Sequence, residues 1–319
     1  MHQKDLKIKK RILISGIGGE IAQGVSRIIR ENFPACDIHG SDCETKHNGK
    51  LFADKLINLP KISSKKKYIL NLNSYIKKNK IDLFIPISDK EISLFILNKR
   101  KIKVKKSIVP SNKLVKIGID KYKTHLFLKS LNINHPWTFL AKDYRKIPKF
   151  PCIVKPRYGK GSKNIFYCKN FKEAKFFSKY IDELIFQEML IPAKQEVTCA
   201  IYRFKNKKIK IIQLMRKLKE SYTHWAKVIK NSKIEKLCKK VAKEIDFYGP
   251  ANFQLILTKK GPMIFEINPR FSSTVLMRNY LGFTDLLWSF QEKFGLKLTE
   301  NKIQVGRIIS RYDEINFLN

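Results

Sequence analysis

The stretch Gly261-Pro262-Met263-Ile264-Phe265-Glu266-Ile267-Asn268-Pro269-Arg270 decides the fold, because an apolar strand ends there in a carboxylate, an amide and a guanidinium. Glu266 and Asn268 are two residues apart, so their side chains point to the same face of a strand. Arg270 follows them and can donate hydrogen bonds to a phosphate oxygen. The stretch therefore predicts a strand end that binds a cation and a phosphate group.

A second strand is expected just upstream, over residues 251–257, and residues 258–261 supply the turn of an antiparallel hairpin. Folding about this turn places Gln254 opposite residue 265 or 266. Three oxygen-bearing side chains then converge on one hard cation. This arrangement predicts phosphoryl-transfer chemistry, and the alternative is an ordinary half-buried hairpin whose polar ends cap a sheet.

The hairpin resembles the metal-binding end of an ATP-grasp domain. Its Gln…Glu-x-Asn-Pro-Arg form is most similar to the carbamoyl phosphate synthetase large subunit and its short relatives. The resemblance implies that Gln254, Glu266 and Asn268 hold Mg²⁺ or Mn²⁺ against the phosphates of ATP. It also implies that Arg270 faces the transferred phosphate.

A second motif covers residues 151–162, where a buried strand delivers Lys155 and a loop with Gly159, Gly161 and Ser162 follows. Glycine lets backbone N–H groups approach a phosphate without a Cβ in the way. In ATP-grasp enzymes the matching lysine contacts the nucleotide, and the loop closes over the β and γ phosphates. The motif is weak alone, but it stands about a hundred residues before the hairpin, as the family resemblance requires.

The third element, residues 184–190, resembles the family's adenine hinge, in which backbone groups near Glu188 and Leu190 pair with the adenine edge. Glu196 matches the glutamate that binds the ribose hydroxyls. The alternative is a core strand that ends at a proline turn.

A fourth match lies at the start of a helix expected from Asp120 to Leu131, where the family carries an Asp-Lys pair. The resemblance implies that Lys121 reaches the phosphates; the alternative is a solvated lysine. Arg216 follows another strand toward the same cleft, and we predict that it grips the carboxylate of the substrate.

The amino-terminal third predicts a β-α-β unit, with a buried strand at residues 11–15, a glycine turn at 16–19 and a helix over 20–32. Asp42 near the end of the next strand leaves a dinucleotide-binding interpretation open. The glycine spacing is irregular, and ATP-grasp enzymes usually open with such a Rossmann-like domain without a dinucleotide.

Asp89 and Glu91 follow a further strand, Leu83 to Ile87, at the edge where open α/β sheets bind ligands. They are therefore candidates to bind the second substrate. They are also candidates to cap a helix from Glu91 to Leu97, which is the role we favour for Asp89.

Composition adds a formal net charge of +39, from 66 Lys plus Arg against 27 Asp plus Glu. Such a charge attracts polyanions in a salt-dependent way. The lysines are dispersed, however, and no nucleic-acid-binding motif accompanies them. We attribute the charge to compositional bias and expect no specific nucleic-acid partner; attraction to a polyanionic substrate or partner is the alternative.

The six cysteines form no C-x-x-C pair, and most of them lie in apolar segments, as expected for reduced core thiols. Cys36, His39, Cys43 and His47 lie within twelve residues and offer a zinc alternative. Their spacing matches no standard zinc module.

The predicted fold class is α/β and α+β, a Rossmann-like domain followed by a two-lobed ATP-grasp fold. We place the Rossmann-like domain at residues 1–110, the lobe with the glycine loop at 111–190, and the lobe with the metal-binding hairpin and tail at 191–319. No apolar run approaches the roughly 20 residues that span a bilayer, and no signal peptide is recognised. We therefore expect a cytoplasmic protein without a membrane partner.

The resemblance implies an ATP-dependent ligase that joins a carboxylate to an amine or ammonia through an acyl phosphate. Its partners are then small-molecule substrates such as an amino acid or a sugar acid of a surface-polysaccharide pathway, and a homodimer is left open. One alternative is a ligase acting on a carboxylate borne by a protein or nucleic acid, and another is an ATP-binding regulator without turnover.

Overall fold

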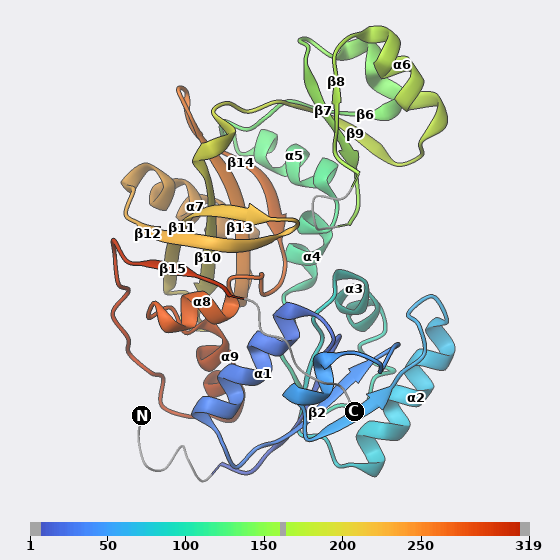
Figure 1. Ribbon diagram of the computed structural model, residues 1–319, viewed down its shortest axis with the longest axis vertical. Helices are drawn as coiled ribbons and strands as arrows, with labels where there is room; N and C mark the ends of the chain where they lie inside the picture. Colours follow the sequence, from blue (N-terminus) through green and yellow to red (C-terminus); the bar gives the residue numbers. More distant parts are fainter. Residues whose placement is uncertain (1–7, 160–163, 313–319) are drawn as a thin grey trace.

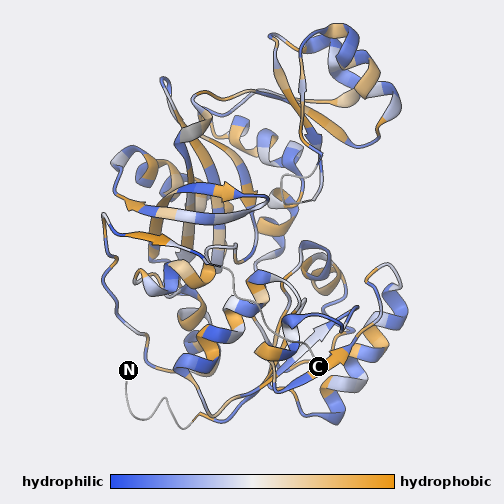
Figure 2. Ribbon diagram, in the orientation of Figure 1, coloured by the Kyte–Doolittle hydropathy of each residue, from blue (hydrophilic) through white to orange (hydrophobic). Residues whose placement is uncertain are grey.

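The computed structural model describes residues 8–159 and 164–312, which form three sheets with flanking helices (Figure 1). Short 3₁₀ helices span Asn48–Phe52, Ala141–Lys146 and Ala193–Gln195. Figure 2 shows hydrophilic and hydrophobic residues mixed along the helices, as expected where one face of each is buried. In the part of the chain that the structure describes, no helix is long and apolar enough to cross a membrane.

The amino-terminal domain is a five-stranded parallel sheet in the order β3-β2-β1-β4-β5. Its strands are β1 (Arg11–Ser15), β2 (Asp37–Asp42), β3 (Lys55–Asn58), β4 (Leu83–Ile85) and β5 (Lys106–Ser107), and its helices are α1 (Glu20–Asn32), α2 (Lys65–Lys78) and α3 (Asp89–Leu97). Ile12 and Ile14 pack on the α1 face, whereas Leu13 packs on the α2 and α3 face. The period-two alternation of β1 thus buries both faces, and the predicted β-α-β unit is confirmed.

A smaller antiparallel sheet carries the strand that bears Lys155. It has the order β6-β9-β7-β8, with β6 (Thr138–Leu140), β7 (Cys152–Pro156), β8 (Phe166–Cys168) and β9 (Leu184–Glu188). Helix α6 (Phe171–Tyr180) covers one face by inserting Ala174 among Cys152, Val154 and Phe186. This lobe projects at one end of the molecule in Figure 1.

The third sheet is six-stranded and runs β14-β13-β10-β11-β12-β15. Its strands are β10 (Glu196–Arg203), β11 (Ile209–Lys219), β12 (Tyr222–Ile229), β13 (Gly249–Thr258), β14 (Gly261–Asn268) and β15 (Ile308–Ser310), and the helices around it are α4 (Asn112–Gly118), α5 (Lys121–Ser130), α7 (Ser232–Ile245), α8 (Val275–Tyr280) and α9 (Asp285–Phe294). One face packs on α4, α5 and α7, and part of the other packs on α8 and α9. The uncovered remainder of that second face carries the polar side chains described below.

Helix α7 agrees with the helix predicted over residues 233–245, and its cap and apolar pattern explain why it forms there. Asn231 caps it by accepting hydrogen bonds from the backbone N–H groups of Lys233 and Ile234. Its apolar residues recur every three or four positions and are buried against the six-stranded sheet.

Two groups of helices join parts of the chain that are distant in sequence. Helices α4 and α5 place Leu114 and Leu128 in the core of the six-stranded sheet, and α8 and α9 place Val275 and Phe290 against α1. The division of the chain near residues 110 and 190 stays a prediction.

Candidate functional site

The β13–β14 hairpin has the register expected from the sequence. Gln254 lies opposite Glu266, and Asn252 lies opposite Asn268, with a bulge after Gln254. Gly261 forms the turn at a φ of +102°, a conformation that glycine adopts without strain. Gln254, Glu266 and Asn268 therefore lie side by side on one face; their role as metal ligands stays a prediction.

The same face of the neighbouring strands adds an ion pair that joins two predicted site residues. Nε of Arg216 donates to Oε1 of Glu196 at 3.0 Å, and Nη2 contacts the same oxygen. Nη1 donates to Oγ1 of Thr223 at 3.4 Å. The sequence placed Glu196 on the ribose and Arg216 on the substrate, whereas the structure couples the two side chains directly. Both roles stay predictions.

Lys121 on α5 and Lys155 on β7 lie near Glu266, because the charges of Lys121 and Glu266 both act on Lys155. Nζ of Lys121 donates to the carbonyl of Gly159 at 2.7 Å and lies 4.0 Å from Oε1 of Glu266. Lys121 is buried, which excludes the solvated-lysine alternative. Nζ of Lys155 lies 5.3 Å from the ring centroid of Phe265, and burial lowers the pKa of Lys155 to about 8 against the opposing attraction of Glu266.

The loop after β7 is only partly described. Gly159 has a φ of +98°, in keeping with a turn that requires glycine. Gly161 and Ser162, which the sequence assigns to the phosphates, lie outside the described residues.

An ion pair missed by the sequence analysis ties this loop to α5. Asp120 caps the helix through the backbone N–H groups of Tyr122 and Lys123. It also accepts two hydrogen bonds from Arg157, at 2.9 and 2.7 Å. The arginine that follows Lys-Pro was the available signal, since a bidentate arginine–carboxylate pair fixes geometry better than a lysine does.

The hinge segment, residues 184–190, consists of β9 and the two residues after it. The backbone N–H of Glu188 donates to the carbonyl of Trp137 at 3.0 Å, and the Glu188 carboxylate accepts from Trp137 N–H at 3.3 Å. Leu190 is buried. Pairing of this segment with adenine stays a prediction.

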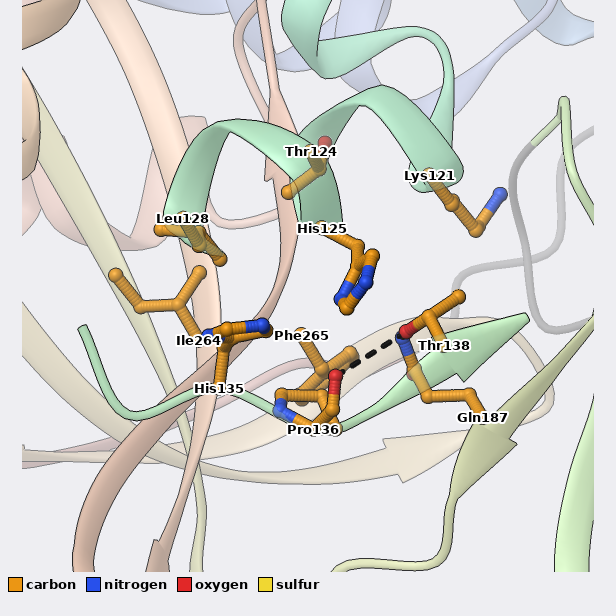
Figure 3. A pocket seen from close by; sticks show the side chains of 10 residues that line it. All are labelled: Lys121, Thr124, His125, Leu128, His135, Pro136, Thr138, Gln187, Ile264 and Phe265. Carbon is orange, nitrogen blue, oxygen red and sulfur yellow. Dashed lines mark hydrogen bonds between the residues drawn. The ribbon is translucent and has the colours of Figure 1, made fainter. Parts of the chain in front are cut away.

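A pocket lined in part by Lys121 contains two imidazole rings (Figure 3). The rings of His125 and His135 are 4.8 Å apart. Burial, together with the charge of His135, lowers the pKa of His125 to about 4, so His125 is neutral at pH 7. Neither histidine was singled out from the sequence, because only the packing of α5 against residues 135–138 brings them together.

Asp89 and Glu91 are placed differently from the expectation, whereas the role of Arg270 at the transferred phosphate stays a prediction. Helix α3 begins at Asp89, and Ser88 is its N-cap in a capping box with Glu91, so the capping role predicted for Asp89 is wrong. Glu91 is buried and accepts hydrogen bonds from Ser15, at 2.7 Å, and from the Tyr68 hydroxyl, which removes it from the candidates for substrate binding. Asp89 instead accepts a hydrogen bond from Nε of Arg270 at 2.8 Å.

A carboxyl group at the start of α1 also escaped the sequence analysis. Glu20 follows the glycine turn and forms an ion pair with Arg311 from the end of the chain's described part. Burial raises the pKa of Glu20 to about 7, although Arg311 opposes the shift.

The zinc alternative does not match the observed geometry. Sγ of Cys36 donates to a backbone carbonyl, and His39 bonds to Tyr75 and an aspartate beside it, while Cys43 is exposed. His47 accepts from a backbone N–H of its own loop. These side chains diverge, and among residues 8–159 and 164–312 no group of three His, Cys, Asp or Glu side chains could hold a metal ion.

The geometry of the glycine turn also disagrees with the dinucleotide-binding interpretation. A Cβ at Gly18 would lie 2.7 Å from the His47 ring, so this ring covers the glycine turn. The Asp42 carboxylate accepts from the Gly18 N–H at 3.1 Å instead of facing an open ribose site.

Comparison with protein families gives two matches along the chain. Residues 119–274 match the ATP-grasp domain, and residues 12–109 match the PylC-like, N-terminal domain. The first range contains the two lysines, the hairpin and Arg270.

Individual relatives agree with these matches. The carbamoyl phosphate synthase large chain of Helicobacter pylori strain J99 is 24% identical over 85% of this chain, which spans only 28% of that relative's length. N5-carboxyaminoimidazole synthetase from Staphylococcus aureus, complexed with ADP, superposes with a TM-score of 0.76 at 16% identity, over 97% of this chain and 83% of that one. The biotin carboxylase domain dimer of Hydrogenobacter thermophilus 2-oxoglutarate carboxylase, in complex with MgADP, ADP and bicarbonate, gives a TM-score of 0.67 at 14% identity, over 93% and 72% of the two chains. The chain thus contains an ATP-grasp domain, at residues 119–274, behind a PylC-like amino-terminal domain at residues 12–109.

Proposed function

We propose that the protein is an ATP-dependent ligase that joins a small carboxylate to an amine or to ammonia through an acyl phosphate. The observation that carries this proposal is the meeting of Lys121 and Glu266, 4.0 Å apart, with the buried Lys155 near enough for both charges to act on it. Two lysines that can bind a triphosphate thus lie close to a carboxylate that can bind a metal ion.

The hairpin fits a hard divalent cation. Gln254, Glu266 and Asn268 all offer oxygen atoms, which Mg²⁺ and Mn²⁺ prefer. Oδ1 of Asn268 accepts one hydrogen bond, from Arg270 at 3.2 Å, and a carbonyl oxygen has a second lone pair for a metal. When bound, the metal would offset the negative charge gathered between the triphosphate and the attacking carboxylate.

The positively charged side chains of the protein would bind and orient the reactants. Lys155 and Lys121 would bind phosphate oxygens of ATP, and Arg270 would face the transferred group. An oxygen of the substrate carboxylate attacks the γ-phosphorus and ADP leaves; the amine then displaces phosphate and gives up a proton. Orienting the reactants in this way lowers the barrier without a dedicated base for the first step.

We propose an amino acid or a sugar acid of a surface-polysaccharide pathway as the carboxylate partner. Cytoplasmic location and a homodimer stay predictions. The homodimer has support in the biotin carboxylase domain named above, which is described as a dimer.

The test is a screen for ADP release with pooled carboxylates and amines, with Mg²⁺ or Mn²⁺, followed by mass spectrometry of the product. We expect release that requires the metal, one carboxylate pool and one amine pool together. MgADP binding without release from any pool would instead favour an ATP-binding regulator.

We expect Lys155→Ala to weaken ATP binding by about 2 kcal/mol, the range for a charge-assisted contact in a buried site. Because burial lowers the Lys155 pKa to about 8, the ammonium is lost as pH rises past that value, and the parent's affinity should fall. Calorimetry at fixed salt between pH 7 and about 9 measures both effects.

Lys155→Arg should flatten this pH dependence, because arginine stays charged, and Lys66→Ala on the exposed face of α2 should leave affinity unchanged. Equal affinities for Lys155→Ala and Lys66→Ala would assign Lys155 a purely structural role.

A second candidate, a ligase for a polymer-borne carboxylate, draws support from helix α6. Lys172, Lys175 and Lys179 share its exposed face with Phe176 and Tyr180. These two aromatic residues are 58% and 62% exposed, and their ring centroids are 4.9 Å apart. Lysines beside exposed rings suit an anionic chain with stacking groups.

We expect only weak, salt-sensitive nucleic-acid binding, because most lysines are dispersed. Binding should fall steeply between low and physiological salt and leave ADP release unchanged, as a filter-binding titration beside the ADP assay would measure. Salt-resistant binding that stimulates ADP release, and is lost in Phe176→Ala, would favour the polymer substrate.

A further inference from the structure

Arg270 is held by a contact with the amino-terminal domain, far away in the sequence. Its Nε donates to Oδ1 of Asp89 at 2.8 Å, across 181 residues, and both side chains are mostly buried. Nη1 donates to the carbonyl of Phe271 at 2.9 Å, and Nη2 donates to Oδ1 of Asn268 at 3.2 Å. Since a guanidinium has five N–H groups, two remain for a ligand.

Asp89 is the one charged group among these three acceptors. The Phe271 carbonyl and the Asn268 amide are neutral, so Asp89 alone among them supplies the negative charge that a mostly buried guanidinium requires. A charged hydrogen bond to Nε also fixes the plane of the guanidinium, which two neutral bonds fix less firmly.

Asp89 is itself fixed by the core of the amino-terminal domain. It is the first residue of α3, directly after the N-cap Ser88, whose hydroxyl shares a capping box with Glu91. Glu91 accepts hydrogen bonds from Ser15 at the end of β1 and from Tyr68 on α2. The strand order β3-β2-β1-β4-β5 reverses between β1 and β4, so this network lies at the sheet's topological switch point.

We propose that Asp89 is a positioning residue through which the amino-terminal domain orients Arg270, so that its two remaining N–H groups meet an anionic oxygen group of the reactants. The proposal rests on the proposed function for the identity of that group. It gives the amino-terminal domain a part in the chemistry even though its glycine turn is covered by His47.

The primary test observes Arg270 without any substrate. In a ¹⁵N–¹H spectrum, the Nε–H signal of Arg270, assigned by its loss in Arg270→Lys, should exchange slowly with solvent in the parent. Asp89→Asn should speed that exchange by about tenfold or more, because the charged acceptor is gone, and Asp89→Glu should restore part of the protection.

The matched control is Tyr280→Phe. It removes another hydrogen bond between the amino-terminal domain and the rest of the chain, from the Tyr280 hydroxyl to Glu31 at 2.6 Å, without touching Arg270. Its Nε–H exchange and its kcat should match those of the parent.

Turnover supplies the second readout. Asp89→Asn should lower kcat for ADP release by about tenfold or more while MgADP affinity stays within about threefold, because orientation and not nucleotide binding is lost. Unchanged Nε–H exchange in Asp89→Asn, or a kcat loss that simply follows lost MgADP affinity, overturns the proposal. If the parent itself releases no ADP from any pool, the proposed function fails, and the exchange measurement still decides the role of Asp89.

Discussion

Glu266→Gln is expected to lower kcat for ADP release by at least about 100-fold, the scale of a lost catalytic electrostatic contact. Glu266 is the one carboxylate among the three proposed metal ligands, and it lies between Gln254 and Lys121. Glutamine preserves the shape but removes the charge that holds a divalent cation. The measurement is ADP release at saturating metal, with the melting temperature followed in parallel.

The matched control is Glu235→Gln, which neutralises a carboxylate on α7 that pairs with Lys239 outside the cleft. It should turn over like the parent. Activity of Glu266→Gln within about threefold of the parent would contradict the proposed metal site.

Arg278→Ala is expected to lower the free energy of unfolding by about 3–5 kcal/mol, the cost of leaving one charge of a buried pair without its partner. Arg278 is fully buried and donates to Asp285 at 2.9 and 2.6 Å, and also to Ser272 and Thr274. This network includes Ser272 and Thr274 from the segment that follows Arg270. Urea denaturation at pH 7 measures the loss.

The pH dependence of this loss has a definite sign. Burial raises the pKa of Asp285, and Arg278 opposes that shift. Without Arg278 the folded protein favours the protonated carboxyl even more, so stability should fall as pH rises above the unfolded pKa of Asp285. The deficit of Arg278→Ala should therefore be smaller at pH 5 than at pH 7.

A double variant separates the charge from the packing. Arg278→Met with Asp285→Leu replaces the pair by apolar side chains and should recover much of the stability, because neither charge is then left alone. A double variant as unstable as Arg278→Ala would show that shape, and not the unpaired carboxylate, dominates.

Local patterns determined a large part of this fold from the sequence alone. The apolar strand at residues 261–268 and the turn before it predicted the hairpin and placed Gln254 opposite residue 265 or 266, and the structure has it opposite Glu266. The spacing of apolar residues fixed α1 and α7, and the family resemblance pointed to the ATP-grasp fold. These features depend on turn chemistry and on periods of 2 and 3.6 residues, which a single sequence displays.

The partners of the polar side chains were decided only by tertiary structure. The sequence offered Asp89 as a helix cap or substrate ligand and Arg216 as a ligand of the substrate carboxylate. The structure pairs Asp89 with Arg270 and Arg216 with Glu196. Both contacts depend on how separate strands and domains pack, over separations of 181 and 20 residues. A mostly buried charge needs an opposite charge nearby, and the packing of distant segments decides which one that is. A local sequence pattern therefore does not predict the pair.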